Sequence, residues 1–234
     1  MAHSHCEHHG SAAEAGTARG SDVILPAEIA GIRVPDTELA KAVTGLVGAV
    51  SPVPLFNHVT RSFIFGSIFG ASKGLAFDPE LLFVAAMMHD LGLTDPYIAD
   101  ARFEIDGADA AARILRERGY PEAKIDLVWE AIALHASMEI PMRRAPEVAI
   151  VHVGVFMDAG FNADKIPAPV IHEVFEALPR LNSSAHMIEA IGAVLRRKPH
   201  TAYLAFEKDI ASRTVPGFDP PNFCDRKAPP PFDT

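Results

Sequence analysis

The amino-acid sequence predicts an all-α fold. Apolar residues recur at helical spacing between residues 31 and 212, in segments bounded by Pro, Gly, Ser, Thr or Asp. No segment shows the alternation of a strand beside a hairpin turn. The chain has 234 residues, of which 49% are hydrophobic, so it is long enough to bury a substantial core. We therefore expect one helical domain over residues 31–212.

Boundary residues place the helices one by one. Asp36 or Thr37 can cap a first helix that ends near residue 50, before prolines interrupt the chain. Asp78 and Pro79 open a third helix that is almost wholly apolar up to His89, so we expect it to be buried at the centre. The remaining helices are expected at 57–70, 106–118, 121–136, 146–159, 167–178, 184–197 and 201–212.

The two ends of the chain differ from this core. Residues 1–30 are rich in Ala, Gly, Ser and His without an apolar period, which indicates a flexible head. A solvated tail is the simplest interpretation of this head, although its clustered side chains could bind a transition metal weakly. These side chains are His3, His5, Cys6, His8 and His9. Residues 213–234 are rich in proline and are expected to form an extended arm.

Charge and cysteine content exclude several classes of partner. The formal net charge is -9 and the Lys and Arg residues are scattered, so nucleic acid is not expected to bind. No apolar run approaches the ~18 residues that a membrane span needs. Only Cys6 and Cys224 are present, and no signal peptide is evident, which favours a cytoplasmic protein. We expect a small-molecule substrate, and a homo-oligomer is compatible with the sequence.

Four residues form a candidate metal site. His89 and Asp90 end the apolar third helix, where an unpaired charge would be costly to bury. A hydrogen-bonded pair that only caps the helix would also satisfy them. However, antiparallel packing of the preceding helix would bring His58 beside His89, and Asp158 ends another apolar helix. Two imidazoles and two carboxylates suit Zn²⁺, Fe²⁺ or Mn²⁺ and leave positions open for water and substrate.

Six segments in this order resemble the HD-domain metalloenzyme superfamily, and within it the cyanamide hydratase-like group. They lie between about residues 32 and 206. They read SP at 51–52 with FNHVTR at 56–61, MHDLG at 88–92, FEIDGA at 103–108, AIALH at 131–135, FMDAG at 156–160 and FEALPR at 175–180. The resemblance implies a Zn²⁺ enzyme that adds water to cyanamide to give urea. It also implies that His58, His89, Asp90 and Asp158 hold the metal.

The residues also support this chemistry directly. A zinc-bound water has its pKa lowered towards ~7, which would let hydroxide attack an electrophilic carbon at neutral pH. Asp90 and His135 are the expected catalytic residues. His135 follows an apolar run and could donate a proton to the developing nitrogen anion or position the substrate. The alternative for His135 is a structural histidine of the core. His152 is assigned to packing because its spacing from Asp158 places it elsewhere on the helix.

Four further residues are expected to form the substrate pocket. Phe56 and Met157 would give the pocket an apolar wall. Arg61, one turn after His58, could steady a site carboxylate or form a surface salt bridge. Glu104 could line the entrance or orient His135. The set is Phe56, Arg61, Glu104 and Met157.

Three other functions remain open. An HD-type phosphohydrolase acting on nucleotides would carry an acid about one turn after the His-Asp pair, where Leu93 and Thr94 stand, and cations for phosphate. A di-iron oxygenase would recruit His135 and His152 as additional ligands. A non-catalytic helical module with a structural metal would not need a histidine beside the ligands.

Overall fold

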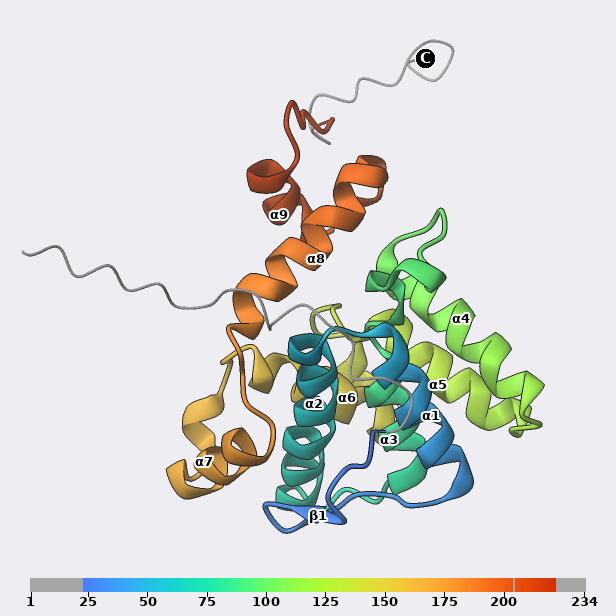
Figure 1. Ribbon diagram of the computed structural model, residues 1–234, viewed down its shortest axis with the longest axis vertical. Coiled ribbons are helices and arrows are strands. Elements are labelled where there is room, and N and C mark those ends of the chain that lie inside the picture. The colour runs from blue at the N-terminus through green and yellow to red at the C-terminus, as the bar shows by residue number, and fades with distance from the viewer. Residues whose placement is uncertain (1–22, 204, 222–234) are drawn as a thin grey trace, which may run out of the picture.

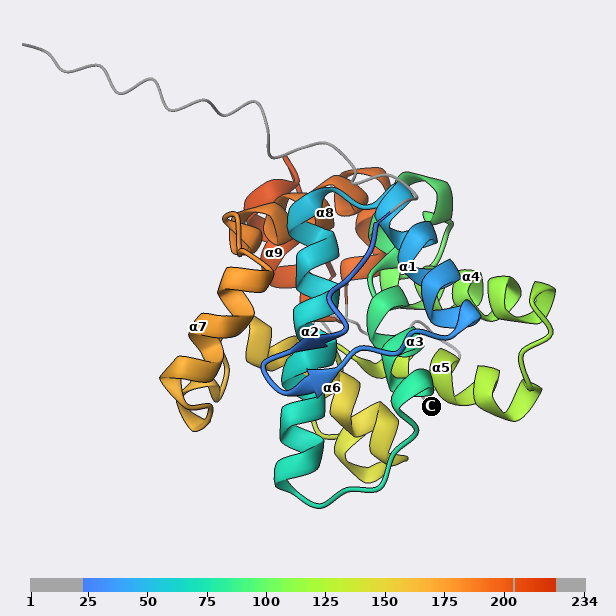
Figure 2. The same ribbon diagram turned by 60° about the horizontal axis from the view of Figure 1, so that its bottom comes forward.

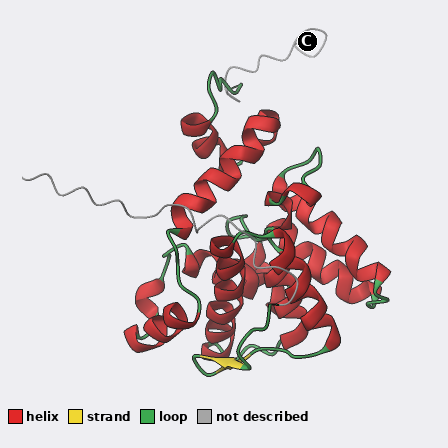
Figure 3. Cartoon of the chain, in the orientation of Figure 1, coloured by secondary structure: helices red, strands yellow, loops and turns green. Residues whose placement is uncertain are grey.

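The computed structural model describes residues 23–203 and 205–221, and helices are the main secondary structure of this part (Figure 3). The predicted all-α class is confirmed. The helices are α1 (Glu38–Val50), α2 (Val53–Ser72), α3 (Pro79–Met88), α4 (Phe103–Glu117), α5 (Glu122–Leu134), α6 (Pro146–Asp158), α7 (Ala168–Ala177), α8 (Ser183–Arg197) and α9 (Glu207–Thr214). Short 3-10 turns lie at Leu91–Leu93, Asp95–Tyr97, Pro141–Arg143, Ala163–Lys165 and Pro199–Ala202.

A small hairpin precedes the first helix, where the sequence predicted none. Strands β1 (Glu28–Ile29) and β2 (Ile32–Arg33) pair in antiparallel register. Ala30 and Gly31 connect them with φ angles of 49° and 76°, the double left-handed conformation of a type I′ turn. Ala is not a typical residue for this conformation, so the turn has no sequence signal. The hairpin lies at the end of the segment 1–30 for which the sequence predicted a flexible head, and residues 1–22 of that segment lie outside the described part.

Helix α2 begins four residues earlier than predicted. Pro52 is its N-cap and Pro54 lies in its first turn. Backbone N–H groups of the first turn have no intrahelical acceptor, so a proline there loses no hydrogen bond. The prolines at 52 and 54 therefore start the helix instead of separating it from α1. His58 consequently lies in the second turn of α2.

The core is built around α2, α3 and α6, with α1, α4 and α5 packed against them (Figures 1 and 2). The unit of α8 and α9 stands at one end of this bundle (Figure 1). A second, smaller hydrophobic cluster joins this unit to the bundle. It includes Leu195 and Ala211 of the unit and Leu55, Leu93 and Phe103 of the bundle. The last predicted helix is displaced, because residues 199–202 form a tight turn and α9 starts only at Glu207.

Glycines allow α2 and α6 to pack with their backbones in contact. A Cβ atom on Gly154 would lie 2.0 Å from the Ser62 carbonyl oxygen, and one on Gly66 would lie 2.8 Å from that of Ile150. The two helices are therefore antiparallel, and each turn forward on α2 matches one turn back on α6. The same register brings His58 opposite Asp158. Within the described residues, no helix is both long and apolar enough to cross a membrane.

Candidate metal centre

Three buried side chains converge where α2 and α3 meet. The ligand atoms of His58, His89 and Asp90 all lie within 4.8 Å of one another. The Oδ2 atom of Asp90 is 3.2 Å from Nε2 of His89 and 3.5 Å from Nε2 of His58. The expectation that helix packing brings His58 beside His89 agrees with this arrangement.

Hydrogen bonds at the opposite ring nitrogens fix how the two imidazoles face Asp90. Nδ1 of His89 donates to the carbonyl of Ala86 at 2.7 Å, one turn back at the end of α3. Nδ1 of His58 donates to Oδ2 of Asp158 at 2.6 Å. Nε2 of each ring therefore faces the same point, where a bound metal ion would take the place of any proton on that nitrogen.

This arrangement fits a divalent cation. Nε2 of His89 and Oδ2 of Asp90 are buried and have no hydrogen-bond partner. Burial alone would raise the pKa of Asp90, but His89 and His58 together hold it well below its usual range, so the carboxylate is ionised at neutral pH. A buried carboxylate with imidazole lone pairs around it is the donor set of Zn²⁺ and of other first-row divalent ions.

Asp158 is placed differently from the fourth ligand that the sequence suggested. Its carboxylate binds Nδ1 of His58, on the ring edge opposite Asp90, and it is not part of the cluster of three. It also accepts hydrogen bonds from Nε and an Nη atom of Arg61 at 2.6 and 2.9 Å. Burial would raise the pKa of Asp158, but His58 and Arg61 hold it well below its usual range. Asp158 thus orients His58 in this structure.

Arg61 is fully buried and spans between helices. Besides Asp158, its guanidinium donates to the carbonyls of Leu178 and Pro179 at 3.1 Å and to the Ser183 hydroxyl at 3.3 Å. Of the two roles considered from the sequence, steadying a site carboxylate describes this geometry and a surface salt bridge does not. All of these contacts direct Arg61 away from a role in substrate binding.

His135 completes a ring of imidazoles around Asp90. It follows the last residue of α5, and its Nδ1 donates to the Ile132 carbonyl at 2.7 Å, as His89 does one turn back on α3. Its Nε2 lies 3.8 Å from Oδ1 of Asp90, and its ring packs edge-on against His89. Burial and the neighbouring His89 lower the pKa of His135 to about 4. The ring is therefore neutral at pH 7, with a free lone pair on Nε2.

His152 supports His135 from behind. Its Nδ1 donates to the His135 carbonyl at 2.8 Å, and its ring packs on Phe156 at a centroid distance of 4.6 Å. Burial lowers its pKa. This agrees with the packing role expected from its spacing on the helix.

An apolar cavity of about 370 Å³ opens beside the cluster. Among the described residues that line it, only His58, Asp90 and His135 are ionisable. Apolar side chains from α4, the loop after α5, α6 with the loop after it, and the α8–α9 unit supply the other walls. They belong to Phe103, Ala136, Met138, Val155, Phe156, Ala159, Phe161, Met187, Ile191 and Phe206.

None of the four predicted substrate-binding residues lines this cavity. Phe56 and Met157 lie in the core, and Arg61 is engaged by Asp158. Glu104 is buried in an ion pair with Arg102. The predictions missed by one position on two helices, because neighbouring helical side chains point about 100° apart and the cavity faces Phe103 and Phe156 instead. The phenylalanine at each position was the available sequence signal.

A second cavity, of about 330 Å³, lies on the other side of His58. Met187 of α8 lines both cavities. The second cavity is more polar, and it includes Thr94, Asp95 and Arg197, of which the last two form an ion pair at 3.0 Å.

Comparison with known proteins matches the segment that carries this centre. Residues 55–157 match the family model described as HD domain. Two proteins of Saccharomyces cerevisiae, cyanamide hydratase DDI2 and cyanamide hydratase DDI3, are each 24% identical to this chain over 190 residues. The aligned region covers 77% of this chain and 84% of each yeast protein.

Proposed function

Because this chain is an HD-domain protein of the cyanamide hydratase-like group, we propose that it adds water to the carbon–nitrogen triple bond of a small nitrile such as cyanamide. Cyanamide would give urea. One observation carries the proposal: buried, unpartnered ligand atoms of His89 and Asp90 lie beside an apolar cavity that also exposes His135. An uncharged, linear substrate suits such a cavity.

His58, His89 and Asp90 would hold a single divalent ion, Zn²⁺ or alternatively Fe²⁺ or Mn²⁺. When bound, such an ion supplies Lewis acidity and makes water a stronger nucleophile at neutral pH. Asp158 keeps the lone pair of His58 directed at the ion by accepting the proton of Nδ1. The apolar walls exclude bulk water from the bound substrate.

His135 would move the proton. Its Nδ1 proton is held by the Ile132 carbonyl, so Nε2 can accept a proton from water as the oxygen forms its bond to the nitrile carbon. The same Nε2 can then return that proton to the nitrogen, whose π bond to carbon has broken. This extends the expected role of His135, because the ring first accepts the proton that it later donates. The initial imidic acid rearranges to the amide by moving its second proton from oxygen to nitrogen.

Two alternatives have less support. Hydrolysis of a phosphomonoester needs cations, and no Lys or Arg is among the described residues that line the apolar cavity. A di-iron oxygenase would require His152 as a ligand, but among the described residues His152 belongs neither to the cluster of three nor to the lining of the cavity, and its ring packs on Phe156.

The proposal is tested by measuring metal content and turnover together. The purified chain is stripped with a chelator and reloaded separately with Zn²⁺, Fe²⁺ or Mn²⁺. Metal per chain is then determined by elemental analysis, and urea release from cyanamide is followed. We expect one ion per chain and urea production. The variants His89→Ala and Asp90→Ala should lose the ion and the activity together, because each removes a ligand.

His172→Ala is the matched control, because His172 is an exposed histidine of α7 far from the cluster in sequence. It should keep both metal and turnover. Full metal occupancy in His89→Ala would reject the metal site. Release of phosphate from a nucleoside monophosphate in preference to turnover of cyanamide would instead support the phosphohydrolase.

A further inference from the structure

We infer that the preferred substrate of this site is a nitrile with an apolar substituent about the size of an aromatic ring. The inference rests on the proposed hydratase function and specifies its substrate class. The substituent would occupy the apolar cavity, and the C≡N group would face His58, Asp90 and His135. The overall change is R–C≡N plus water to R–CO–NH₂, so no further co-reactant is needed.

The volume of the apolar cavity favours a large substituent. The cavity measures about 370 Å³. A protein cavity of about 150 Å³ is already large enough to hold benzene, whereas a water molecule occupies about 30 Å³. Cyanamide has only three non-hydrogen atoms, so its volume is about that of two waters. It would leave most of the cavity unfilled, and the contacts of its walls would remain unmade.

The apolar lining of the cavity favours a substituent without hydrogen-bond donors. The amino group of cyanamide has two N–H donors that need partners when water is removed. The three ionisable lining residues, His58, Asp90 and His135, lie within a few ångströms of one another and face the reacting group. The rest of the lining consists of hydrophobic side chains and alanines. An apolar substituent matches these walls, whereas an amino group would be left without partners among them.

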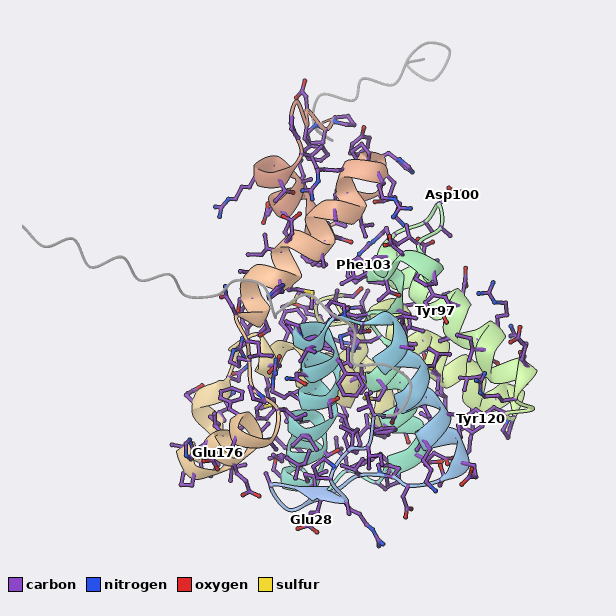
Figure 4. The ribbon with its side chains drawn as sticks, viewed as in Figure 1. Glu28, Tyr97, Asp100, Phe103, Tyr120 and Glu176 are labelled. Atoms are coloured by element: carbon purple, nitrogen blue, oxygen red, sulfur yellow. The ribbon has the colours of Figure 1, made fainter. Side chains whose placement is uncertain are left out.

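Four phenylalanine rings in the cavity lining favour an aromatic substituent. Phe156 and Phe161 pack edge to face at a centroid distance of 5.3 Å, and Phe103 and Phe206 do so at 6.5 Å. Phe103 stands at the end of α4 that lies toward α8 (Figure 4). All four rings line the cavity. Such edges and faces are the surfaces on which another aromatic ring packs favourably.

Large apolar side chains are exposed at the mouth of the cavity. Met138, Phe161 and Phe206 line it and are nevertheless 65%, 59% and 44% exposed. These three come from the loop after α5, the loop after α6 and the segment before α9. Large exposed apolar side chains gathered around one opening are typical of a ligand-binding site. They would attract an apolar substituent and offer nothing to a small polar molecule.

The experiment compares cyanamide, acetonitrile and benzonitrile as substrates of the metal-loaded protein. We expect kcat/KM for benzonitrile to exceed that for acetonitrile by at least about tenfold, since filling an apolar pocket discriminates on this scale. Binding of benzonitrile to the metal-free protein is measured in parallel by ligand-observed NMR. This second readout does not depend on turnover.

Ala159→Trp is designed to fill the cavity from the exposed end of α6. It should weaken benzonitrile binding at least tenfold and should lower kcat/KM for benzonitrile more than that for cyanamide. Ala123→Trp is the matched control, because Ala123 is an exposed alanine in the first turn of α5, outside the cavity lining. It should leave both quantities unchanged.

The outcomes separate the two proposals. Turnover that favours cyanamide or acetonitrile over benzonitrile overturns the inference and leaves the hydratase function standing. Benzonitrile binding that is absent, or unaffected by Ala159→Trp, also overturns it. If no nitrile is hydrated, the proposed function fails. Benzonitrile binding that Ala159→Trp abolishes would then still support an apolar, ring-sized ligand.

Discussion

A single imidazole, that of His58, links the candidate ligand cluster to a buried ion pair. Its Nε2 faces Asp90 and its Nδ1 donates to Asp158, which in turn is held by Arg61. Burying Arg61 and Asp158 is costly, and their hydrogen bonds to each other and to nearby carbonyls offset this cost. The pair has a positioning role, because it decides which nitrogen of His58 carries the proton.

Asp158→Asn should weaken metal binding by about 10–100-fold without abolishing it, which is the usual effect of losing an outer hydrogen-bond partner of a metal-binding histidine. The measurement is a titration of the chelator-stripped protein with Zn²⁺. Asp106→Asn is the matched control, because Asp106 is another buried aspartate in an ion pair, with Lys198. It should lower stability but leave the affinity for Zn²⁺ unchanged. Absence of metal at saturating Zn²⁺ in Asp158→Asn would identify Asp158 as a direct ligand.

His135→Ala should retain metal and lose about a hundredfold or more in kcat, the scale of a lost acid–base group. The physical reason is that its Nε2 faces Asp90 without serving in the cluster of three. Steady-state kinetics on cyanamide, with metal content measured in parallel, test this. His172→Ala again serves as the control. Loss of metal in His135→Ala would reassign His135 from proton transfer to metal ligation.

At the scale of elements, the packing of α2 on α6 aligns the site. The pairs Ser62 with Gly154 and Gly66 with Ile150 continue the register that sets His58 opposite Asp158. Any separation of the two helices would therefore lengthen the hydrogen bond that orients His58.

Gly154→Ala tests this register. The added Cβ would meet the Ser62 carbonyl at 2.0 Å, a backbone atom that cannot rotate away. We expect a loss of about 2 kcal/mol or more in the free energy of unfolding, and weaker metal binding. Urea denaturation and a metal titration measure both. Gly192→Ala is the control, because its Cβ would meet side chains and no backbone atom: those of Thr214 at 3.0 Å and Arg196 at 3.3 Å. Equal stability of the two variants would contradict the close packing.

The sequence predicts those parts of the fold and site that leave a local signal. His89, His135 and Asp158 each stand out because they end an apolar helix, and the helices themselves follow from periodicity and caps. The partnership of Arg61 with Asp158 joins residues far apart in the chain, which no local pattern encodes. The cavity walls were misassigned because helical phase near a helix end decides whether Phe156 or Met157 faces the cavity.

At the scale of the whole molecule, the apolar cavity lies between two parts of the chain. His58, Asp90 and His135 belong to residues 55–157, which match the HD domain. Met187, Ile191 and Phe206 belong to the α8–α9 unit, outside that match. Under the proposed function, the α8–α9 unit would complete a substrate pocket whose remaining walls and metal ligands belong to the bundle, and substrate preference would depend on how firmly α8 and α9 are docked.

Buried charges contribute to this docking. Lys198, just after α8, forms an ion pair with Asp106 of α4 and donates to the Ala101 carbonyl at 2.5 Å. Arg102 lies beside both Glu104 of α4 and Glu207 of α9. One cation thus faces two buried carboxyl groups at this junction.

This imbalance makes the stability of the junction depend on pH. Burial and the neighbouring Glu104 raise the pKa of Glu207 from 4.5 to about 7, and Arg102 only partly counteracts them. The folded protein therefore holds a proton on Glu207 that the unfolded chain releases. The resulting stabilisation is fully present below about pH 4.5 and is lost as the pH rises through about 7. We expect the wild type to lose stability between pH 5.5 and 8, with faster amide hydrogen exchange in α9.

Glu207→Gln isolates this effect, because the amide keeps the shape of the protonated carboxyl group and cannot titrate. Other buried groups also titrate in this range, so the informative quantity is the difference between the two pH profiles of thermal unfolding. That difference should grow in favour of the variant as the pH rises. Glu176→Gln, at an exposed position of α7, should retain the wild-type profile. Parallel profiles for the wild type and Glu207→Gln would show that this carboxyl group does not govern how α9 docks on α4.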